Sequence, residues 1–393
     1  MLSIEHRTIV TATVPILEQG GETLTRHFYQ LLFRDYPEVI PYFNQVHQQS
    51  GAQQRALADA VLMYAKNIDR LDALGPLAST IVNKHVALQI VPEHYPMVGA
   101  SLLKAISEVL GPDVATDAVL EAWGAAYEQL AGILIGAETV AYATQASAPG
   151  GWNGMRDFVV VEKRSESDEI TSMVLKPRDG KAIMAHLPGQ YIGIRVATED
   201  REHRRQYSLS AISNGFTYQI SVKRQPNGKV SNLLHDDLQV GDSVELLAPS
   251  GAFIVADRDI PLVLISGGIG ITPTLPMLDH ALTTGRDVIF IHAARHRGVH
   301  AFHTRLEELA ASHPQLRYFH LYAEQGDGQP VPQITGLLDS AKLAAWLPES
   351  RNVDAYFVGP TPFMKAVKLS LHELGVPESQ IHYEFFGPAE ALN

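Results

Sequence analysis

The sequence contains no cysteine among its 393 residues. This absence excludes disulfides, cysteine nucleophiles, thiolate-bound iron–sulfur clusters and cysteine zinc sites. It fits a reducing compartment, and we expect a cytoplasmic location. The chain also lacks a basic N-terminus followed by a long apolar run, and its longest apolar stretch is interrupted by glycines. We therefore expect neither a signal peptide nor an integral membrane segment.

Positive charge is scarce as well. The chain has 31 lysines and arginines against 43 aspartates and glutamates, which gives a formal net charge of −12. An acidic chain gives no electrostatic reason to expect nucleic acid as the main partner. The remaining composition, with 46% hydrophobic and 19% charged residues, is that of ordinary globular domains. The oligomeric state has no sequence signal, and we expect a monomer.

The spacing of apolar residues changes twice along the chain. Residues 1–140 have helical periodicity and end in a long helix, expected from about Thr116 to Tyr142. Residues 141–151 are small and polar, which is typical of a linker. Residues 152–256 contain short runs rich in β-branched residues, which predict an antiparallel barrel. Residues 257–393 alternate buried strands with helices, which predicts a parallel sheet. The helices are expected around Thr274–Thr284, His300–Ser312 and Phe363–Leu374.

His85 is the first candidate site residue of the helical segment. It shares a helical face with Ile81, Val82 and Leu88. Taken alone, such a histidine is more often a half-buried core residue with a backbone partner than a metal ligand. Its interpretation therefore depends on the residues that accompany it.

A set of residues at fixed separations favours the interpretation of His85 as a metal ligand. Phe43 lies six residues after Pro37, Gln53 and Leu57 are four residues apart, and His85 follows Gln53 by 32 residues. This set resembles a globin. The resemblance implies heme b, with His85 as the proximal iron ligand and Phe43 as the aromatic residue that packs on the heme.

The resemblance also implies a distal pocket. Tyr29, Gln53 and Leu57 match the distal tyrosine, glutamine and leucine of globins of this kind. Tyr29 and Gln53 can donate hydrogen bonds to dioxygen, where negative charge gathers, and Leu57 would narrow the pocket.

The proximal side resembles a flavohemoglobin more than a plain oxygen carrier. Tyr95 and Glu138 match family residues that hold the proximal histidine in a hydrogen-bonded triad, and a carboxylate there increases electron donation by the imidazole. Lys84 precedes the histidine, as in the family, where it tunes electron entry. Without the resemblance, Glu138 would be read equally well as a solvated carboxylate at a helix end.

The barrel segment carries the motif Arg205-Gln206-Tyr207-Ser208, fifteen residues after Gln190-Tyr191. It resembles the R-x-Y-S motif of ferredoxin-reductase-like flavoproteins, which bind FAD. The resemblance implies that Arg205 pairs with the FAD pyrophosphate. It places Tyr207 along the flavin and Ser208 near the reactive flavin nitrogen, with Tyr191 packed on another part of the cofactor.

A second FAD element follows in Gly228, Lys229, Val230 and Ser231. Gly228 permits a close backbone approach, and Ser231 is expected to cap a helix whose first amides face the pyrophosphate. The alternative is an ordinary surface turn that caps a short helix.

The third segment contains a glycine-rich turn between a buried strand and a helix, which suits a nucleotide pyrophosphate. The residues expected to bind there are Gly268, Ile269, Gly270, Ile271, Thr272 and Pro273. Gly359 and Pro360 resemble the late turn near the nicotinamide, although Val358 stands where the family usually has cysteine.

Arg295 and Arg297 could meet the 2′-phosphate of NADPH or be plain surface charge. We expect either NADH or NADPH, with NADH at least as well used.

The C-terminal segment resembles the one that closes over the flavin. Its candidate residues are Glu384, Phe385, Phe386, Gly387 and Pro388. Phe386 matches the aromatic that shields the flavin until nicotinamide displaces it. Glu384 matches a carboxylate between flavin and heme, the counterpart of Lys84, and Phe385 replaces a common cysteine. The alternative is a tail strand with core aromatics.

The three segments, in this order, resemble a bacterial or fungal flavohemoglobin. The implied architecture is an all-α globin, an antiparallel β-barrel FAD domain and a ferredoxin-reductase-like α/β NAD(P) domain. The implied activity is nitric oxide dioxygenase, in which NAD(P)H reduces FAD, FAD reduces the heme iron, and dioxygen converts nitric oxide to nitrate. Two alternatives stay open. One is an oxygen or nitric oxide carrier or sensor with its own reductase, although no output module is visible. The other is a reductase of peroxides, quinones or lipids.

Overall fold

A computed structural model describes residues 2–44, 48, 51–198, 201–324, 334–387 and 392. The chain divides into two compact units. The first contains Met1–Ala148, Arg195–Arg205 and Gly387–Glu390, and the second contains the remaining segments, Pro149–Ile194, Gln206–Phe386 and Ala391–Asn393. Within the part of the chain that the structure describes, no helix is both long and apolar enough to cross a membrane.

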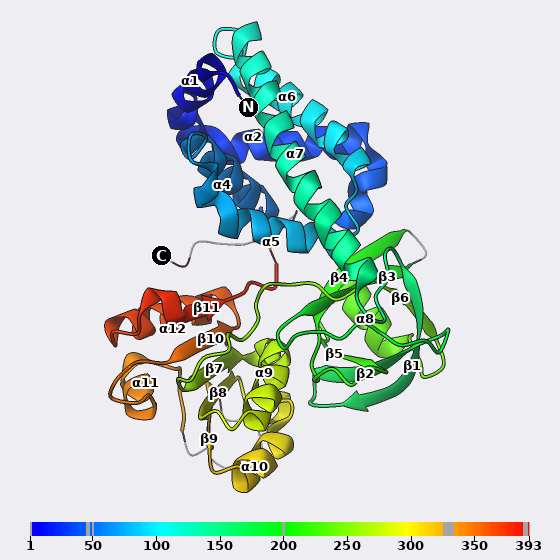
Figure 1. Ribbon diagram of the computed structural model, residues 1–393, viewed down its shortest axis with the longest axis vertical. Helices are drawn as coiled ribbons and strands as arrows, with labels where there is room; N and C mark the ends of the chain where they lie inside the picture. The colour runs from blue at the N-terminus through cyan, green and yellow to red at the C-terminus, as the bar shows by residue number, and fades with distance from the viewer. Residues whose placement is uncertain are drawn as a thin grey trace. The chain divides into compact units, whose positions relative to one another are not determined.

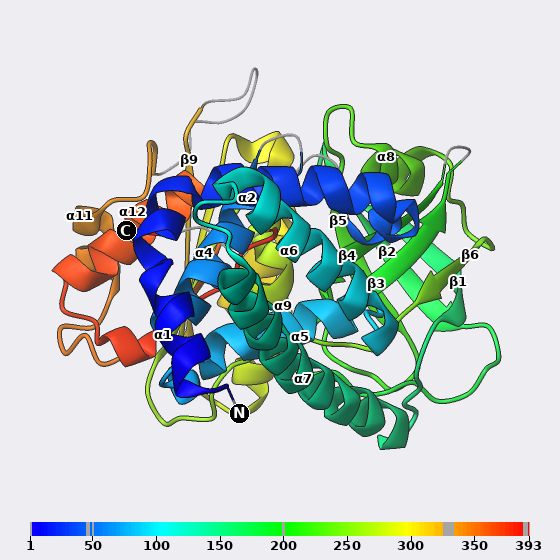
Figure 2. The same cartoon turned by 90° about the horizontal axis from the view of Figure 1, so that it is seen from above.

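The first unit is a bundle of α-helices whose apolar faces meet in one core. Its helices are α1 (Ile4–Ala12), α2 (Val14–Asp35), α4 (Ala52–Lys66), α5 (Gly75–Val86), α6 (Tyr95–Leu110) and α7 (Asp117–Ser147). In α2, Leu24, Phe28 and Leu31 recur at helical spacing and are buried. Helix α7 packs against α1, α5 and α6, and α2 packs against α4 and α6 (Figures 1 and 2).

The last helix of this unit corrects one expectation. Helix α7 runs to Ser147 and not to about Tyr142. Residues 143–147 include two alanines and no proline or glycine, and alanine has the highest helix propensity of all residues. Small, polar composition was therefore mistaken for a linker where the chain continues the helix.

The β-strands between residues 156 and 246 form a barrel that closes on itself. Its strands are β1 (Arg156–Ser165), β2 (Ile170–Pro177), β3 (Tyr191–Ala197), β4 (Glu202–Ser208), β5 (Tyr218–Lys223) and β6 (Ser243–Leu246). They form one sheet in the order β4-β3-β6-β1-β2-β5. An antiparallel bridge between Leu209 and Ile220 connects the end of β4 to β5, the two ends of this order. One helix, α8 (Lys229–Asp236), lies beside these strands (Figure 1).

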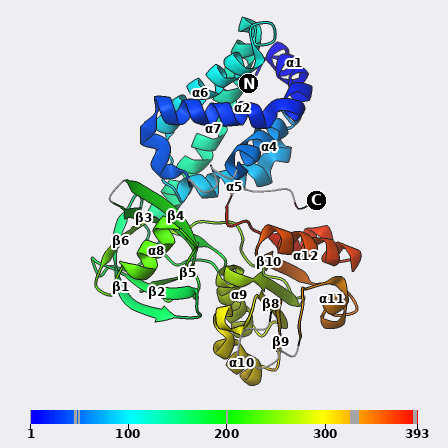
Figure 3. The same cartoon turned by 180° about the vertical axis from the view of Figure 1, so that it is seen from behind.

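The α/β part contains a five-stranded parallel sheet. Its strands are β7 (Leu262–Gly267), β8 (Val288–Ala294), β9 (Leu316–Tyr322), β10 (Asp354–Val358) and β11 (Ile381–Tyr383), in the order β11-β10-β7-β8-β9. Helices α9 (Ile271–Thr283) and α10 (His303–Ser312) cover one face, and α11 (Ser340–Trp346) and α12 (Thr361–Glu373) cover the other (Figure 3). With both faces covered, every residue of β7 and β10 is buried.

The strand order reverses between β7 and β10, because β8 and β9 lie on one side of β7 and β10 and β11 on the other. Such a reversal opens a crevice at the carboxyl ends of the strands, where open α/β sheets bind their ligands. The fold class predicted from the sequence is confirmed. Helix α9 begins earlier than expected, at Ile271, and α10 begins later, at His303.

Candidate functional site

The first unit brings His85, Tyr95 and Glu138 together. His85 lies in the last turn of α5, Tyr95 begins α6, and Glu138 lies in α7. Glu138 Oε1 lies 2.7 Å from His85 Nδ1 and accepts a 2.6 Å hydrogen bond from the Tyr95 hydroxyl. The Tyr95 oxygen is also 3.2 Å from His85 Nδ1. Three helices therefore supply one triad centred on a single ring nitrogen.

This triad decides which nitrogen of His85 can bind a metal. A carboxylate only accepts hydrogen bonds, so the Nδ1 that faces Glu138 carries the proton and Nε2 keeps its lone pair. The Glu138 side chain is 2% exposed, whereas that of His85 is 31% exposed. Burial, and then the Glu138 carboxylate, raise the pKa of Tyr95, so its hydroxyl stays a donor. An imidazole backed by a carboxylate is a common arrangement for a metal ligand.

The surroundings of His85 fit a flat, apolar cofactor. Tyr95 packs with Ala131 and Leu134, and a group of apolar side chains is only partly buried against this cluster. These side chains are Ala78, Ile81, Val82, Ile90, Tyr127, Leu130 and Ile135. Partly exposed apolar side chains beside an imidazole indicate a volume that a ligand fills. The Nε2 lone pair and this apolar surface together fit heme.

The distal residues also meet. Tyr29 is 5% exposed, and its ring centroid lies 5.6 Å from that of Phe43. The Tyr29 hydroxyl is hydrogen-bonded to Gln53 of α4. Burial raises the pKa of Tyr29, so the phenol stays protonated and able to donate. Leu57, one turn further along α4, packs against the same core.

Lys84 contacts the C-terminal segment inside the first unit. Its Nζ donates a 2.6 Å hydrogen bond to the carbonyl oxygen of Gly387. The functional pairing of Lys84 with Glu384 stays a prediction. Pro388 lies outside the described residues.

Tyr191 marks the candidate flavin region of the barrel. It is 7% exposed and forms a bridge with Ser250. Gly251, with φ +119°, packs on the ring, and a Cβ there would lie 2.9 Å from Tyr191 Cε1. Burial, and then the Glu384 carboxylate, raise the pKa of Tyr191. The tail residue Glu384 therefore lies near this tyrosine.

The R-x-Y-S motif occupies the second half of β4. Side chains alternate along a strand, so Arg205 and Tyr207 share one face while Gln206 and Ser208 share the other. Arg205 Nη1 donates 2.7 Å to the carbonyl oxygen of Arg204, and Ser208 is 8% exposed. A strand lets alternate side chains of one motif contact separate parts of an elongated cofactor.

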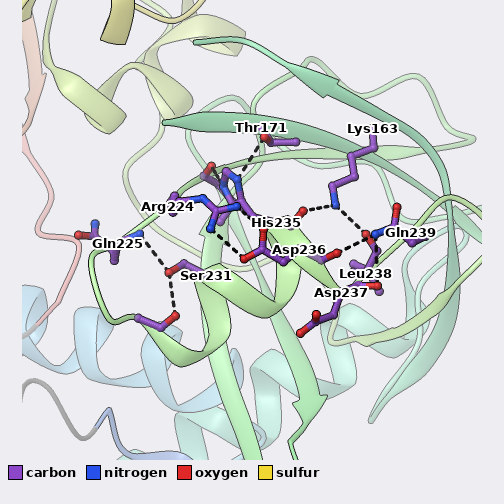
Figure 4. A network of polar contacts seen from close by, with 12 residues as sticks. Lys163, Thr171, Arg224, Gln225, Ser231, His235, Asp236, Asp237, Leu238 and Gln239 are labelled. Atoms are coloured by element: carbon purple, nitrogen blue, oxygen red, sulfur yellow. Dashed lines mark hydrogen bonds and ion pairs between the residues drawn. The ribbon is translucent and has the colours of Figure 1, made fainter. Parts of the chain in front are cut away.

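The second FAD element forms the start of α8 and requires one correction. Ser231 was expected to be the helix cap, and this was wrong because Gly228 holds that position. Ser231 lies inside the helix, and its Oγ accepts a 3.1 Å hydrogen bond from the Gln225 amide (Figure 4). A Cβ at residue 228 would lie 2.5 Å from this Oγ, so only glycine fits. In the part of the chain that the structure describes, no side chain caps α8, which suits a helix start that meets a phosphate. Lys229 and Val230 are its first two residues.

Polar contacts hold α8 on the barrel (Figure 4). Lys163 Nζ donates to the carbonyl oxygens of His235 and Leu238, at 2.6 and 2.7 Å, near the helix C-terminus. Arg224 forms an ion pair with Asp236. These contacts fix the direction in which the start of α8 points.

The glycine-rich turn lies at the sheet reversal. Gly268–Gly270 form a short 3₁₀ turn after β7, and Ile271, Thr272 and Pro273 begin α9. Gly268 has φ +55° and open space where a Cβ would be, whereas a Cβ at Gly270 would lie 2.2 Å from the Val358 carbonyl oxygen. The turn after β7 therefore packs directly on the end of β10, next to Gly359 and Pro360.

The tail is partly strand and partly exposed. Strand β11 pairs with β10, and Phe385 packs partly buried against the α11–α12 side of the sheet. Phe386 is 46% exposed, which leaves its ring available to cover another ring.

Sequence reasoning missed a row of polar side chains behind the glycine turn. Ser266, His292 and His320 are paired across β7, β8 and β9. A signal existed for Ser266 and His292, because each is an isolated polar residue in a buried stretch of strand, but its meaning required the strand register.

Family models match three successive parts of the chain. A globin model covers residues 26–134, an oxidoreductase FAD-binding domain model covers 157–254, and an oxidoreductase NAD-binding domain model covers 264–369. The predicted cofactor classes, heme, FAD and a nicotinamide nucleotide, are thereby confirmed.

Relatives match the chain over its whole length. The flavohemoprotein of Burkholderia sp. (strain TH2) is 59% identical over 100% of both chains, and that of Pseudomonas putida is 58% identical, again over 100% of both. The crystal structure of a flavohemoglobin from Malassezia yamatoensis with bound FAD and heme covers 98% of this chain and 100% of its own, with 28% identity and a TM-score of 0.87. The FAD/NAD-binding domain of a nitric oxide dioxygenase from Vibrio cholerae covers 59% of this chain and 99% of its own, with 40% identity and a TM-score of 0.55. The chain is a heme and flavin oxidoreductase, and it belongs to the flavohemoprotein family.

Proposed function

We propose that this chain is a nitric oxide dioxygenase that converts nitric oxide and dioxygen to nitrate at the expense of NAD(P)H. The observation that carries the proposal is the triad of His85, Tyr95 and Glu138. A carboxylate behind the imidazole suits a globin that receives electrons, and the same chain contains the flavin and nicotinamide domains that would supply them. The Vibrio cholerae structure, which bears this activity in its name, supports the proposal.

The bound cofactors supply electron transfer and the dioxygen chemistry, while the chain's own residues position the reacting groups and polarise them. Glu138 holds the Nδ1 proton of His85 and keeps Nε2 available as a ligand. Tyr29 and Gln53, hydrogen-bonded to each other, present donors where negative charge would build up on the distal side. Leu57 and Phe43 would limit the volume there.

In the reductase half, we propose that the FAD contacts come from Tyr191, the R-x-Y-S motif and the start of α8. The nucleotide contacts would come from the Gly268–Gly270 turn with Gly359 and Pro360. The domain limits 152–256 and 257–393 belong to the same proposal, whereas the first domain extends beyond residue 140 with α7, which ends at Ser147.

The contacts of Arg295 favour NADH as the electron donor. Arg295 Nη2 donates 2.6 Å to Glu169 Oε2 and forms an ion pair with it. An arginine already paired with a carboxylate is a poorer partner for the 2′-phosphate that distinguishes NADPH. We propose that NADH is used at least as well.

The test measures NADH oxidation and nitrate formation by the purified, heme- and FAD-loaded protein, with and without nitric oxide under air. We expect nitric oxide to accelerate NADH oxidation and to appear as nitrate, one for one. A nitrate yield far below the nitric oxide consumed would overturn the proposal in favour of a carrier. Equal NADH oxidation without nitric oxide, with peroxide or quinone as acceptor, would favour a general reductase.

A further inference from the structure

Four histidines form a layer at the carboxyl ends of the parallel strands. The strand register places His292 and His320 beside Ser266 in one cross-strand row. His300, from the segment before α10, and His303, the first residue of α10, cover this row. The ring centroids of His292 and His300 lie 4.3 Å apart, and those of His303 and His320 lie 5.1 Å apart. His292, His300, His303 and His320 are called the histidine layer below.

The layer is joined to the glycine turn through one hydroxyl. Ser266 Oγ lies 2.8 Å from His292 Nδ1, and the two residues are 0% and 1% exposed. Gly267 follows Ser266 directly, and the turn continues to Gly270, which packs against the end of β10. A shift of Ser266 therefore moves the turn that is expected to hold the nucleotide pyrophosphate.

The hydrogen bonds of the layer match uncharged rings. His300 Nδ1 lies 2.9 Å from the Tyr322 hydroxyl, and its Nε2 lies 3.1 Å from the Tyr318 hydroxyl. A neutral imidazole offers one donor and one acceptor, and two phenols can satisfy both. Among the described residues, the buried Nε2 atoms of His292 and His303 have no hydrogen-bond partner. An additional proton on either atom would find no acceptor.

Charge in the layer is unfavourable. Burial, and then the neighbouring histidines, lower the pKa of His292 to about 3 and hold that of His300 well below its usual value. Arg297, from the turn before α10, adds a positive charge nearby. The carboxylate that faces the layer is Glu307, whose Oε2 lies 3.2 Å from His303 Nδ1. The hydroxyls of Tyr318 and Tyr322 of β9 also face the layer. Asp279 of α9 is paired with Arg305 of α10.

The segment that covers the layer is itself strained. Phe302, which precedes α10, has φ +59° and is 6% exposed. A buried, bulky residue in the left-handed region persists only where its surroundings hold it there. The opening of this segment therefore relieves strain as it admits water to the histidines.

We propose that the histidine layer is a proton-sensitive support for the nucleotide turn, which loosens as the medium becomes acidic and so weakens NAD(H) binding. His292 acts through Ser266 and is a positioning residue. The inference rests on the nicotinamide nucleotide as electron donor and not on nitric oxide as substrate.

The direction of the effect follows from the proton balance. The opened layer binds protons near the ordinary histidine pKa of about 6.5, whereas the closed layer does not. The open state therefore holds more protons below that pH, and the stability of the closed state rises with pH. The stabilisation of the closed layer by its uncharged histidines is complete above about pH 6.5. It is lost progressively as the pH falls toward the lowered pKa of His292, about 3.

The experiment uses the full-length holoenzyme and NAD⁺ as the probe. Calorimetry gives the dissociation constant of NAD⁺ between about pH 7.5 and 5.5, and hydrogen exchange reports the opening of residues 296–303. For the native chain we expect the dissociation constant to rise on the order of tenfold over this range. The protection factors of residues 296–303, which correct for the slower intrinsic amide exchange at low pH, should fall in parallel. His292→Asn, which keeps a polar group near Ser266 but does not titrate, should flatten both dependences. His280→Asn is the matched control, because His280 is exposed on α9 of the same domain.

An unchanged NAD⁺ affinity across this range, or equal pH dependence in the native chain and His292→Asn, would overturn the inference. If His292→Asn does not fold, Tyr322→Phe replaces it. This variant removes one hydrogen-bond partner of His300 with little change in side-chain volume. The pH at which NAD⁺ affinity falls should therefore be higher than in the native chain, and an unchanged pH counts against the inference. This test does not measure nitrate. The inference about the histidine layer can therefore fail while the dioxygenase proposal stands, and the dioxygenase proposal can fail while this inference stands.

Discussion

Two histidine environments in this chain differ in the group that faces the ring. His85 Nδ1 lies 2.7 Å from the Glu138 carboxylate, whereas His292 Nδ1 lies 2.8 Å from the Ser266 hydroxyl. A carboxylate only accepts, so it fixes one tautomer and leaves the other nitrogen as a ligand. A hydroxyl donates or accepts, so it suits a neutral ring without preparing it for a metal.

The number of histidines is therefore a poor guide to chemistry. Four rings lie together in the histidine layer, yet across the described ranges no group of three or more histidine, aspartate or glutamate side chains is arranged to hold a metal ion. In the globin part we propose that a single histidine, His85, is the metal ligand, because one buried carboxylate and an apolar surface accompany it.

The largest expected effect is that of His85→Ala. We expect it to abolish heme retention while flavin stays bound, because the iron loses its protein ligand. The absorption spectrum of the purified protein should lose its Soret band and keep the flavin shoulder. His292→Asn is the contrasting variant and should keep both. An intact heme spectrum in His85→Ala would contradict the assignment.

Glu138→Gln should have an intermediate effect, because it makes the partner of His85 neutral and able to donate. We expect heme affinity, or electron transfer to the heme, to fall about 10–100-fold. The measurements are heme transfer to an acceptor apoglobin and anaerobic reduction by NADH. Glu128→Gln, at an exposed position of the same helix, is the control. Equal rates in the two variants would show that the carboxylate charge is unimportant.

Ser266→Ala should have the smallest effect and act only on the second unit. It leaves His292 Nδ1 buried without its partner, which costs about 1–3 kcal/mol. We expect lower stability against urea and weaker NAD⁺ binding, with the heme spectrum unchanged. Ser312→Ala, at an exposed site in α10, should match the native chain. Weaker heme binding in Ser266→Ala would contradict the conclusion that the environments of His85 and His292 act independently.

The sequence predicted the fold class and the cofactor classes because those signals are local. Buried strands such as β7 and β10 are continuous apolar runs, and the glycine turn is contiguous in the chain. Strand β4 carries no such local signal, because Glu202–Ser208 is polar at nearly every position and is held by its neighbours in the barrel. Its strand character comes from tertiary pairing, which propensity does not encode.

The site residues also differ in how far the local sequence reveals them. His85, Tyr95 and Glu138 could be proposed only through a family resemblance, since the three helices that unite them are far apart in sequence. The cap of α8 was assigned to Ser231 because serine is a favoured cap, whereas the steric limit at Gly228 decides the position. The histidine layer depends on register across three parallel strands, and no single segment contains it.

The bridge between Leu209 and Ile220 also matters before the cofactors are in place. A chain that must acquire heme and FAD passes through a period of incomplete loading after synthesis. Open strand edges exposed in that period would be templates for aggregation. A closed barrel offers few such edges, and the outermost strand β11 of the parallel sheet has only three residues. The closure that shapes the flavin region thus also limits unwanted association between newly made copies.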